Sequence, residues 1–153
     1  MRKLTAAVLV GSLWFAAGAS LRAHDGGHGP KLTDEGKQGG VVSSVINTKD
    51  LKKGAKAEVI YKAELVRSED GMVSVYLYDI KMNTLDMSKF ERKAKGDVEV
   101  QVKKKHTTTP FELNLADGRF VGAAPKASRK PFNIDVYFKQ GDRQLLAAFD
   151  NLD

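Results

Sequence analysis

Apolar and polar side chains alternate along most of the chain after residue 40. Successive side chains of a β-strand point to opposite faces, so a period of two predicts a strand with one buried and one wet face. The segment 56–67 shows the pattern most clearly, with Ala57, Val59, Tyr61 and Ala63 set against charged residues. Similar alternation predicts strands over 41–46, 56–67, 72–80, 97–103, 108–116, 119–123, 132–139 and 144–149.

Turn residues between these runs indicate how the strands connect. Gly71 ends a Ser-Glu-Asp-Gly turn after the second run, and Asp117 with Gly118 separates two later runs. Such turns between alternating segments predict β-hairpins. Ser88 and Glu91 match the spacing of a capping box, which predicts one short helix over 88–95.

About seven or eight short strands with one short helix leave no room for the crossover helices that parallel strands need. We therefore expect an all-β fold with antiparallel strands. An immunoglobulin-like β-sandwich is the favoured architecture, and a barrel is the alternative.

The residues before the strands divide into two parts. Residues 1–23 begin with Arg2 and Lys3, continue with an apolar stretch over 4–19 and end in small residues, which predicts a cleavable secretory signal peptide. The apolar stretch is shorter than the roughly 20 residues of a membrane-spanning helix, which disfavours an uncleaved anchor. We expect cleavage after Ala23, with Ala19 as the alternative, and hence a periplasmic or secreted protein.

Residues 24–40 are polar and rich in glycine, and they have no apolar period. This composition predicts a flexible N-terminal arm. The remaining residues, 41–153, form the expected β-domain. A chain of this length is sufficient for one domain with a hydrophobic core.

Charge and cysteine content narrow the function classes. The chain carries a net charge of +6, and removing residues 1–23 takes away three basic residues and leaves about +3. The run Lys103–Lys105 is interpreted as a solvated strand end, because no aromatic residues interleave with the lysines as in nucleic-acid binders. The chain has no cysteine, which excludes disulfides, a thiolate metal site and a cysteine nucleophile.

No catalytic constellation is evident in the sequence, so we expect a protein that is not an enzyme. The β-region has one histidine, His106, which is interpreted as an exposed turn residue. Nucleophilic catalysis needs a nucleophile, a base and an orienting group together, and no nucleophile motif is present. Paired carboxylates could act as acid and base, and the candidates are Asp79, Asp86, Asp97, Asp135 and Asp150.

The most suggestive chemistry lies in the arm, where His24 and His28 flank Asp25 and two glycines. Imidazole is the commonest protein ligand for copper, nickel and zinc, and the glycines allow the backbone to fold around one ion. After cleavage at Ala23, the α-amino group and imidazole of His24 could together chelate Cu(II). The alternative is that the stretch binds metal only adventitiously.

Methionine could supply a second soft site, because thioethers suit Cu(I). Met72, Met82 and Met87 are close in sequence. We favour the ordinary interpretation that they are core residues.

Several segments resemble small exported β-sandwich proteins found beside heavy-metal efflux and copper-tolerance systems. The likeness lies in the His/Gly-rich start, in Gly39–Val42, in Lys62–Val66, in Asp70-Gly71 leading into Val75–Asp79, and in Lys81–Asp86. The plan is also similar to that of CopC-like periplasmic copper carriers. This resemblance implies that a mature N-terminal histidine binds Cu(II), which would be His24 here.

Two functions follow as hypotheses. The first is an exported β-sandwich protein that binds a transition metal, copper, through His24, Asp25 and His28 as a metal-tolerance accessory. The second is a structural or protein-interaction module of the cell envelope without a metal role. Its candidate contacts are Tyr61, Tyr76, Tyr78 and Tyr137, because tyrosine is enriched at interfaces.

Overall fold

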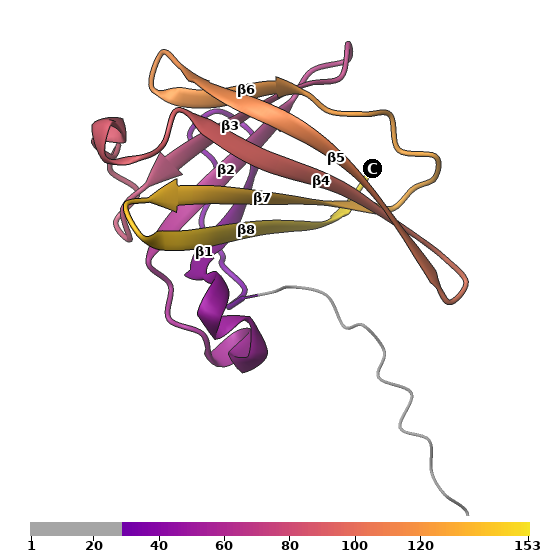
Figure 1. Ribbon diagram of the computed structural model, residues 1–153, viewed down its shortest axis with the longest axis horizontal. Helices are drawn as coiled ribbons and strands as arrows, with labels where there is room; N and C mark the ends of the chain where they lie inside the picture. The colour runs from indigo at the N-terminus through magenta and orange to yellow at the C-terminus, as the bar shows by residue number, and fades with distance from the viewer. Residues whose placement is uncertain (1–28) are drawn as a thin grey trace, which may run out of the picture.

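The computed structural model describes residues 29–153, which form a single β-barrel with short 3-10 helices at its periphery (Figure 1). The 3-10 helices are η1 (Thr48–Lys56) and η2 (Met87–Lys89). The strands are β1 (Val41–Asn47), β2 (Tyr61–Arg67), β3 (Met72–Tyr78), β4 (Lys93–Val102), β5 (Lys105–Ala116), β6 (Arg119–Ala123), β7 (Phe132–Gln140) and β8 (Arg143–Leu152).

Every strand pairs antiparallel with two neighbours, and the sheet closes in the order β1-β2-β3-β6-β5-β4-β7-β8. The last contact in this circle joins β1 to β8, where Val45 lies opposite Ala147 and Asn47 opposite Leu145. The predicted immunoglobulin-like β-sandwich is therefore wrong. A sandwich would leave edge strands with one free side, whereas β1 and β8 are hydrogen-bonded to each other.

The alternation in the sequence could not separate these two architectures. Strands of a sandwich and strands of a small barrel both bury one face and expose the other. The choice depends on whether the first and last strands pair, and the pairing of β1 with β8 involves residues separated by about a hundred positions. The antiparallel arrangement itself is confirmed.

The short helix predicted over 88–95 is also wrong. Only Met87–Lys89 forms a 3-10 turn, and its N-cap is Asp86, whose side chain accepts a hydrogen bond from the backbone N–H of Ser88. Strand β4 already begins at Lys93 because its backbone pairs with β5 and β7. In addition, η1 takes up 48–56, so the second strand begins later than the alternation predicts.

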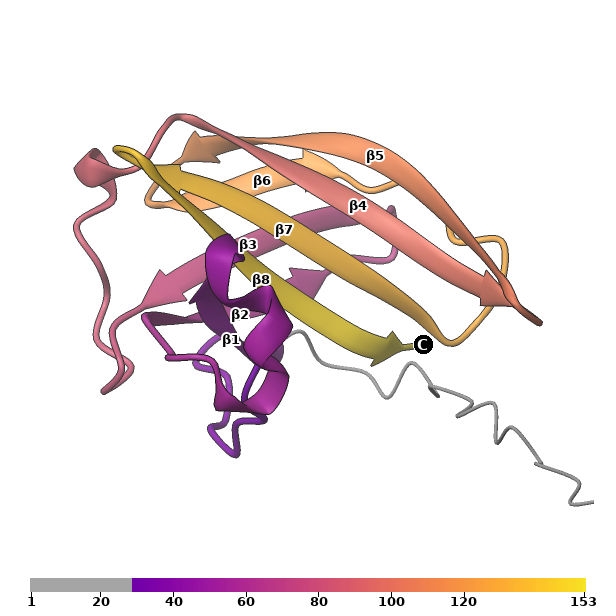
Figure 2. The same cartoon turned by 60° about the horizontal axis from the view of Figure 1, so that its bottom comes forward.

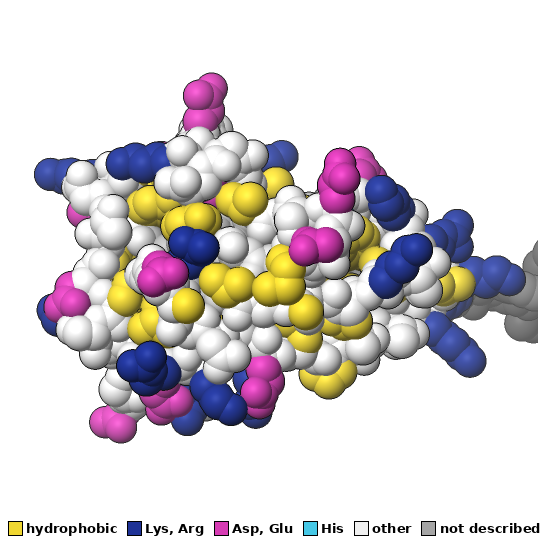
Figure 3. All heavy atoms as spheres, turned by 90° about the horizontal axis from the view of Figure 1, so that it is seen from above, with side chains coloured by type: hydrophobic (Ala, Val, Ile, Leu, Met, Phe, Trp, Pro, Cys, Tyr) yellow, Lys and Arg dark blue, Asp and Glu magenta, His cyan; other side chains and the backbone are white. Residues whose placement is uncertain are grey.

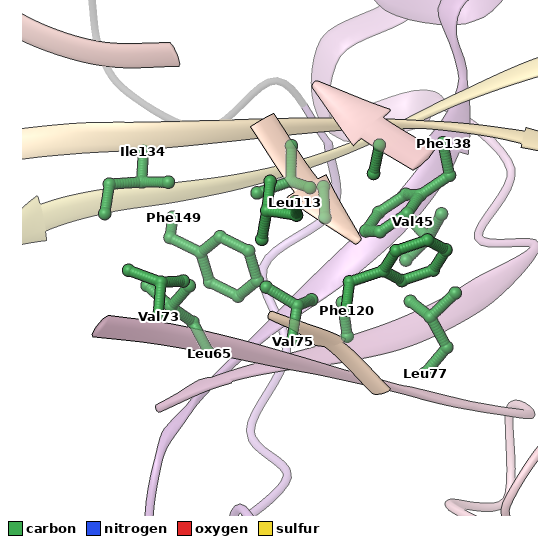
Figure 4. Packing of buried hydrophobic residues seen from close by; sticks show 14 of the residues in the cluster. Val45, Leu65, Val73, Val75, Leu77, Leu113, Phe120, Ile134, Phe138 and Phe149 are labelled. Carbon is green, nitrogen blue, oxygen red and sulfur yellow. The ribbon is translucent and has the colours of Figure 1, made fainter. Parts of the chain in front are cut away.

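Apolar side chains from all eight strands fill the barrel (Figure 4). Phe120 and Phe138 pack with ring centroids 5.1 Å apart, and both are almost fully buried. An eight-stranded barrel has an interior just wide enough for side chains. The barrel is therefore a scaffold with a packed core, and polar chemistry lies on its outer surface and at its ends.

Two parts of the outer surface differ from the rest. Residues 29–40 and η1 cover the outer side of β1, β2 and β8, and Figure 2 shows η1 beside these strands. On another side, the hairpin of β4 and β5 extends past the neighbouring strands (Figures 1 and 2). These two regions carry the polar arrangements described next.

Candidate functional site

Glu64 is a fully buried carboxylate on the outer face of the barrel. Its neighbours Ala63 and Leu65 point into the core, so alternation directs Glu64 outward. The side chain is nevertheless 0 % exposed, because the segment before β1 lies across it. Burying a carboxylate is costly unless hydrogen bonds replace its lost water.

Four donors supply those hydrogen bonds. The backbone N–H groups of Gln38 and Gly40 donate to Glu64 Oε1 over 2.7 and 2.8 Å. The backbone N–H of Lys37 and the hydroxyl of Tyr78 each donate to Oε2 over 2.9 Å. Both oxygens of the carboxylate therefore accept two bonds each, which compensates for its desolvation.

Glycines allow the backbone to approach Glu64 this closely. A Cβ atom at Gly40 would lie 2.3 Å from the carbonyl oxygen of Leu65, and one at Gly36 would lie 2.3 Å from Glu64 Oε1. Between them, Gly39 has a φ of 76°, a conformation that L side chains rarely adopt. The Gly-rich stretch that predicts a flexible arm is thus also the stretch that fits around a carboxylate.

A second buried charge lies next to Glu64 on the same face. Lys62 is 8 % exposed, and its Nζ is 2.6 Å from Asp34 Oδ1. Burial, followed by the bond to Glu64, raises the pKa of Tyr78 to about 12, so its hydroxyl stays protonated and donates. We call Asp34, residues 36–40, Lys62, Glu64 and Tyr78 the N-terminal clamp.

A pocket of about 800 Å³ lies on the outer side of β1 and β8. Its lining includes Gly29, Ser44, Ile46 and Asp150. The Oδ1 atom of Asp150 is buried and has no hydrogen-bond partner among residues 29–153. The pocket therefore has a mixed polar and apolar lining, in which Asp150 is the acidic residue and Lys31 the basic one.

The three predicted metal ligands, His24, Asp25 and His28, lie outside the described residues. Within residues 29–153, no group of three or more His, Cys, Asp or Glu side chains is placed to hold a metal ion. Met82 and Met87 are buried, as expected for core residues, whereas Met72 is 38 % exposed. The three methionines therefore do not share one environment.

His106 lies on β5 and contacts a carboxylate across the strand pair. Its Nδ1 is 2.9 Å from Glu99 Oε1 on β4. The interpretation as an exposed turn residue is correct in part, since the side chain is 34 % exposed but lies within a strand and has a charged neighbour.

Of the candidate carboxylates, Asp97 and Asp135 are brought directly opposite each other on β4 and β7. Asp135 is 7 % exposed, and the hydroxyl of Tyr137 lies 3.5 Å from its Oδ2. Burial and the charges of Asp135 and Asp97 raise the pKa of Tyr137 to about 12. The residues lining the pocket on β1 and β8 do not include this pair.

The other acidic candidates have local structural roles. Asp79 accepts hydrogen bonds from the backbone N–H groups of Lys81 and Asn83 and from the Asn83 amide, and these bonds lower its pKa. Asp86 caps η2 in the same manner. These carboxylates fix turns.

The four tyrosines do not form one exposed aromatic face. Tyr78 is buried in the clamp, and the hydroxyl of Tyr61 is hydrogen-bonded to the amide of Gln140. Tyr76 lies beneath the guanidinium of Arg119, 5.8 Å from it. They therefore contribute mainly to contacts within the molecule.

Sequence reasoning missed the N-terminal clamp. Lys62 and Glu64 alternate with apolar residues, so the pattern assigns both to a wet face. The available signal was the group of glycines in 36–40, because glycine permits a close approach of the backbone to another group. That signal does not identify Glu64 as the contact.

Comparison of the chain with protein-family models, with curated proteins and with solved structures finds no match. Within residues 29–153, no helix is both long enough and apolar enough to cross a bilayer. Interpretation of function therefore depends on the residues themselves.

Proposed function

We propose that this protein is an exported, non-enzymatic barrel that binds a transition-metal ion, copper, through His24, Asp25 and His28. The observation that carries the proposal is the N-terminal clamp. It fastens the segment that follows these three residues onto the barrel wall with three backbone hydrogen bonds to Glu64, whose fourth bond comes from Tyr78 of β3. The barrel then acts as a rigid support for a chelating sequence.

The pocket on β1 and β8 supports the same proposal. Gly29, which directly follows His28, lines this pocket together with Asp150. Asp150 is the acidic residue of this lining, and we infer that its carboxylate supplies an oxygen ligand to an ion held by the two histidines. Two imidazoles with carboxylate oxygens form a donor set that suits Cu(II) or Zn(II).

Titration calorimetry with Cu(II) tests this proposal directly. The protein purified from expressing cells is compared with His24→Ala/His28→Ala and with Asp150→Asn. We expect the double variant to lose binding by at least about tenfold, and Asp150→Asn to weaken it less. Glu112→Gln, a change of an exposed carboxylate on β5, is the matched control.

Equal affinity of the wild type and the double variant would disprove the role of the arm. Sequencing the N-terminus of the exported protein tests the compartment at the same time. A mature chain that starts at His24 would add the α-amino group to the ligands, whereas a chain that starts at Ser20 would remove it.

A role as a protein-interaction module is the second candidate, and the free edge of β5 favours it. β5 pairs with β6 only from Asn114 to Ala116, while its pairing with β4 begins at Lys105. An exposed strand edge can accept a strand from a partner. A photo-crosslinker at Thr107 should then capture one envelope protein regardless of metal, and capture that depends on Cu(II) would contradict it.

A further inference from the structure

We propose that the end of the barrel formed by the β4–β5 hairpin tip and the β6–β7 loop docks onto an anionic lipid surface. We call these segments, 102–105 and 124–131, the basic end. This inference is independent of the metal proposal, because it uses other residues and another side of the molecule.

The hairpin tip projects from the barrel. β4 and β5 stay paired as far as Val102 and Lys105, whereas the pairing of β4 with β7 ends at Glu99 and Asn133. The last residues of the hairpin therefore extend without strands beside them, as Figures 1 and 2 show. A projecting tip can reach a flat surface that the barrel wall cannot touch.

The tip is strongly basic. Lys103, Lys104 and Lys105 are all exposed, and none of them has an ion pair among the described residues. Three adjacent ammonium groups repel one another, and an anionic partner would relieve that repulsion.

A second basic group lies at the same end. The β6–β7 loop carries Lys126, Arg129 and Lys130, and all three are exposed. The pairing of β4 with β7 ends at Glu99 and Asn133, so the β6–β7 loop enters β7 next to the base of the hairpin tip. Figure 3 shows Lys and Arg side chains gathered at the end from which the hairpin projects.

Besides Asp70, two exposed acidic residues lie near this end, against six exposed Lys and Arg side chains. Glu69 is in the β2–β3 turn, which is hydrogen-bonded to the β6–β7 loop, and Asp153 follows Leu152, which pairs with Phe132. Asp70 in the β2–β3 turn binds the Ser68 hydroxyl and the backbone N–H of Met72. Glu99 contacts His106. The basic end therefore keeps a surplus of positive charge that faces solvent.

One apolar residue favours lipid over nucleic acid as the partner. Val102 is 40 % exposed at the tip and continues the apolar side of β4 formed by Val98 and Val100. An apolar side chain between lysines suits a bilayer interface, where the apolar group enters and the cations contact headgroups. Single-stranded nucleic acid would require aromatic side chains for stacking, and the tip has none.

The backbone at the tip holds one of the lysines in the left-handed conformation. Lys103 has a φ of 58°, a conformation that Gly and Asn adopt at lower cost than lysine. A lysine at this position costs the hairpin some stability but places a cation at the point furthest from the barrel.

Cosedimentation with lipid vesicles tests the proposal. Protein purified from expressing cells, with its N-terminus determined by mass spectrometry, is mixed with vesicles of equimolar phosphatidylglycerol and phosphatidylcholine. Vesicles of phosphatidylcholine alone measure any contribution of the apolar stretch 4–19. We expect at least about tenfold stronger partitioning into the anionic vesicles, and loss of this preference as salt is raised from about 0.1 M to 1 M.

Charge-reversal variants distinguish lipid binding through the hairpin tip from binding that depends only on the net charge of the protein. Lys103→Glu/Lys104→Glu/Lys105→Glu should lower partitioning at least about tenfold. The matched control is Lys49→Glu/Lys52→Glu/Lys56→Glu, which makes the same change of net charge on the exposed face of η1. We expect the control to retain most of the binding.

Equal losses in both triple variants would overturn the proposal, because binding would then follow net charge alone. If the hairpin variant fails to fold by circular dichroism, the neutral variant Lys103→Asn/Lys104→Ser/Lys105→Thr gives the same comparison. Stronger binding to duplex DNA than to the anionic vesicles at equal salt would also overturn it.

Discussion

Lysines occur in both the N-terminal clamp on β2 and the basic end on the β4–β5 hairpin, two separate parts of one closed sheet, and they differ in whether they have an ion-pair partner. Lys62 is 8 % exposed and has Asp34 at 2.6 Å, next to the fully buried Glu64. Lys103, Lys104 and Lys105 are exposed, and among the described residues they have no ion pair. One region satisfies its charges within the molecule, and the other leaves them for solvent or a partner.

The position of a charged residue in the barrel therefore decides whether it serves the fold or a partner. A charge on a covered strand face must have fixed hydrogen bonds, so its removal destabilises the fold. A charge on a projecting tip is solvated by water and needs no fixed hydrogen bonds. Its removal should therefore change binding and leave the fold intact. The following predictions test this division.

Glu64→Gln should have the largest effect. The amide would place hydrogen atoms against backbone N–H groups that now donate to the carboxylate, and at least one buried donor would lose its acceptor. We expect the free energy of unfolding to fall by about 3 kcal/mol. Chemical denaturation measures it, with Glu112→Gln on the exposed face of β5 as a control that should change stability by less than about 0.5 kcal/mol.

The same variant distinguishes a local from a global role for the clamp. Hydrogen exchange of the amides of Lys37, Gln38 and Gly40 should lose protection in Glu64→Gln, since these groups donate to the carboxylate. Unchanged protection at all three would show that the clamp does not hold this segment in solution.

Gly40→Ala should have the next largest effect. Its Cβ would lie 2.3 Å from a backbone oxygen of β2, so the segment or the strand has to shift. We expect a loss of about 2 kcal/mol in thermal or chemical unfolding. Gly39→Asn is the matched control, because a Cβ there meets nothing within 4 Å and asparagine tolerates the positive φ; an equal loss in both variants would contradict the close approach.

The strands of the barrel could be predicted because each buries one face. Arg119–Ala123 has the predicted bounds, and the other strands differ from prediction by a few residues at their ends. The barrel closure could not be predicted, because the pairing of β1 with β8 depends on contacts between the two ends of the chain. The helix over 88–95 failed because tertiary pairing of β4 outweighed a local capping signal.

For the metal site and the clamp as well, local sequence patterns predict only what local chemistry determines. The metal ligands His24, Asp25 and His28 remain a prediction, because they follow from local chemistry in residues that the structure does not describe. The clamp could not be derived, since a charged residue that alternates with apolar ones is read as solvent-exposed. Only the three-dimensional path of residues 36–40 shows that Glu64 is covered.

The high pKa of Tyr78 gives the clamp a pH dependence. Its folded pKa of about 12 exceeds the ordinary value of 10.0, so the folded state holds this proton more tightly than the unfolded state. The resulting stabilisation is complete below pH 10 and is lost as pH rises towards 12. The difference in the free energy of unfolding between the wild type and Tyr78→Phe should therefore become smaller from pH 10 to pH 12. Thermal melts that give the same difference at every pH in this range would disprove the linkage.

Lys103→Asn should have the smallest effect on stability and the opposite sign. Asparagine adopts the φ of 58° more easily than lysine, so we expect the free energy of unfolding to rise by up to about 1 kcal/mol. Lys104→Asn, the adjacent turn residue without a positive φ, is the control and should leave stability unchanged. A Lys103→Asn protein that is more stable but binds anionic vesicles less well would show that the lysine serves binding at the expense of stability. A destabilised Lys103→Asn protein would instead show that Lys103 stabilises the fold, as Glu64 does in the clamp.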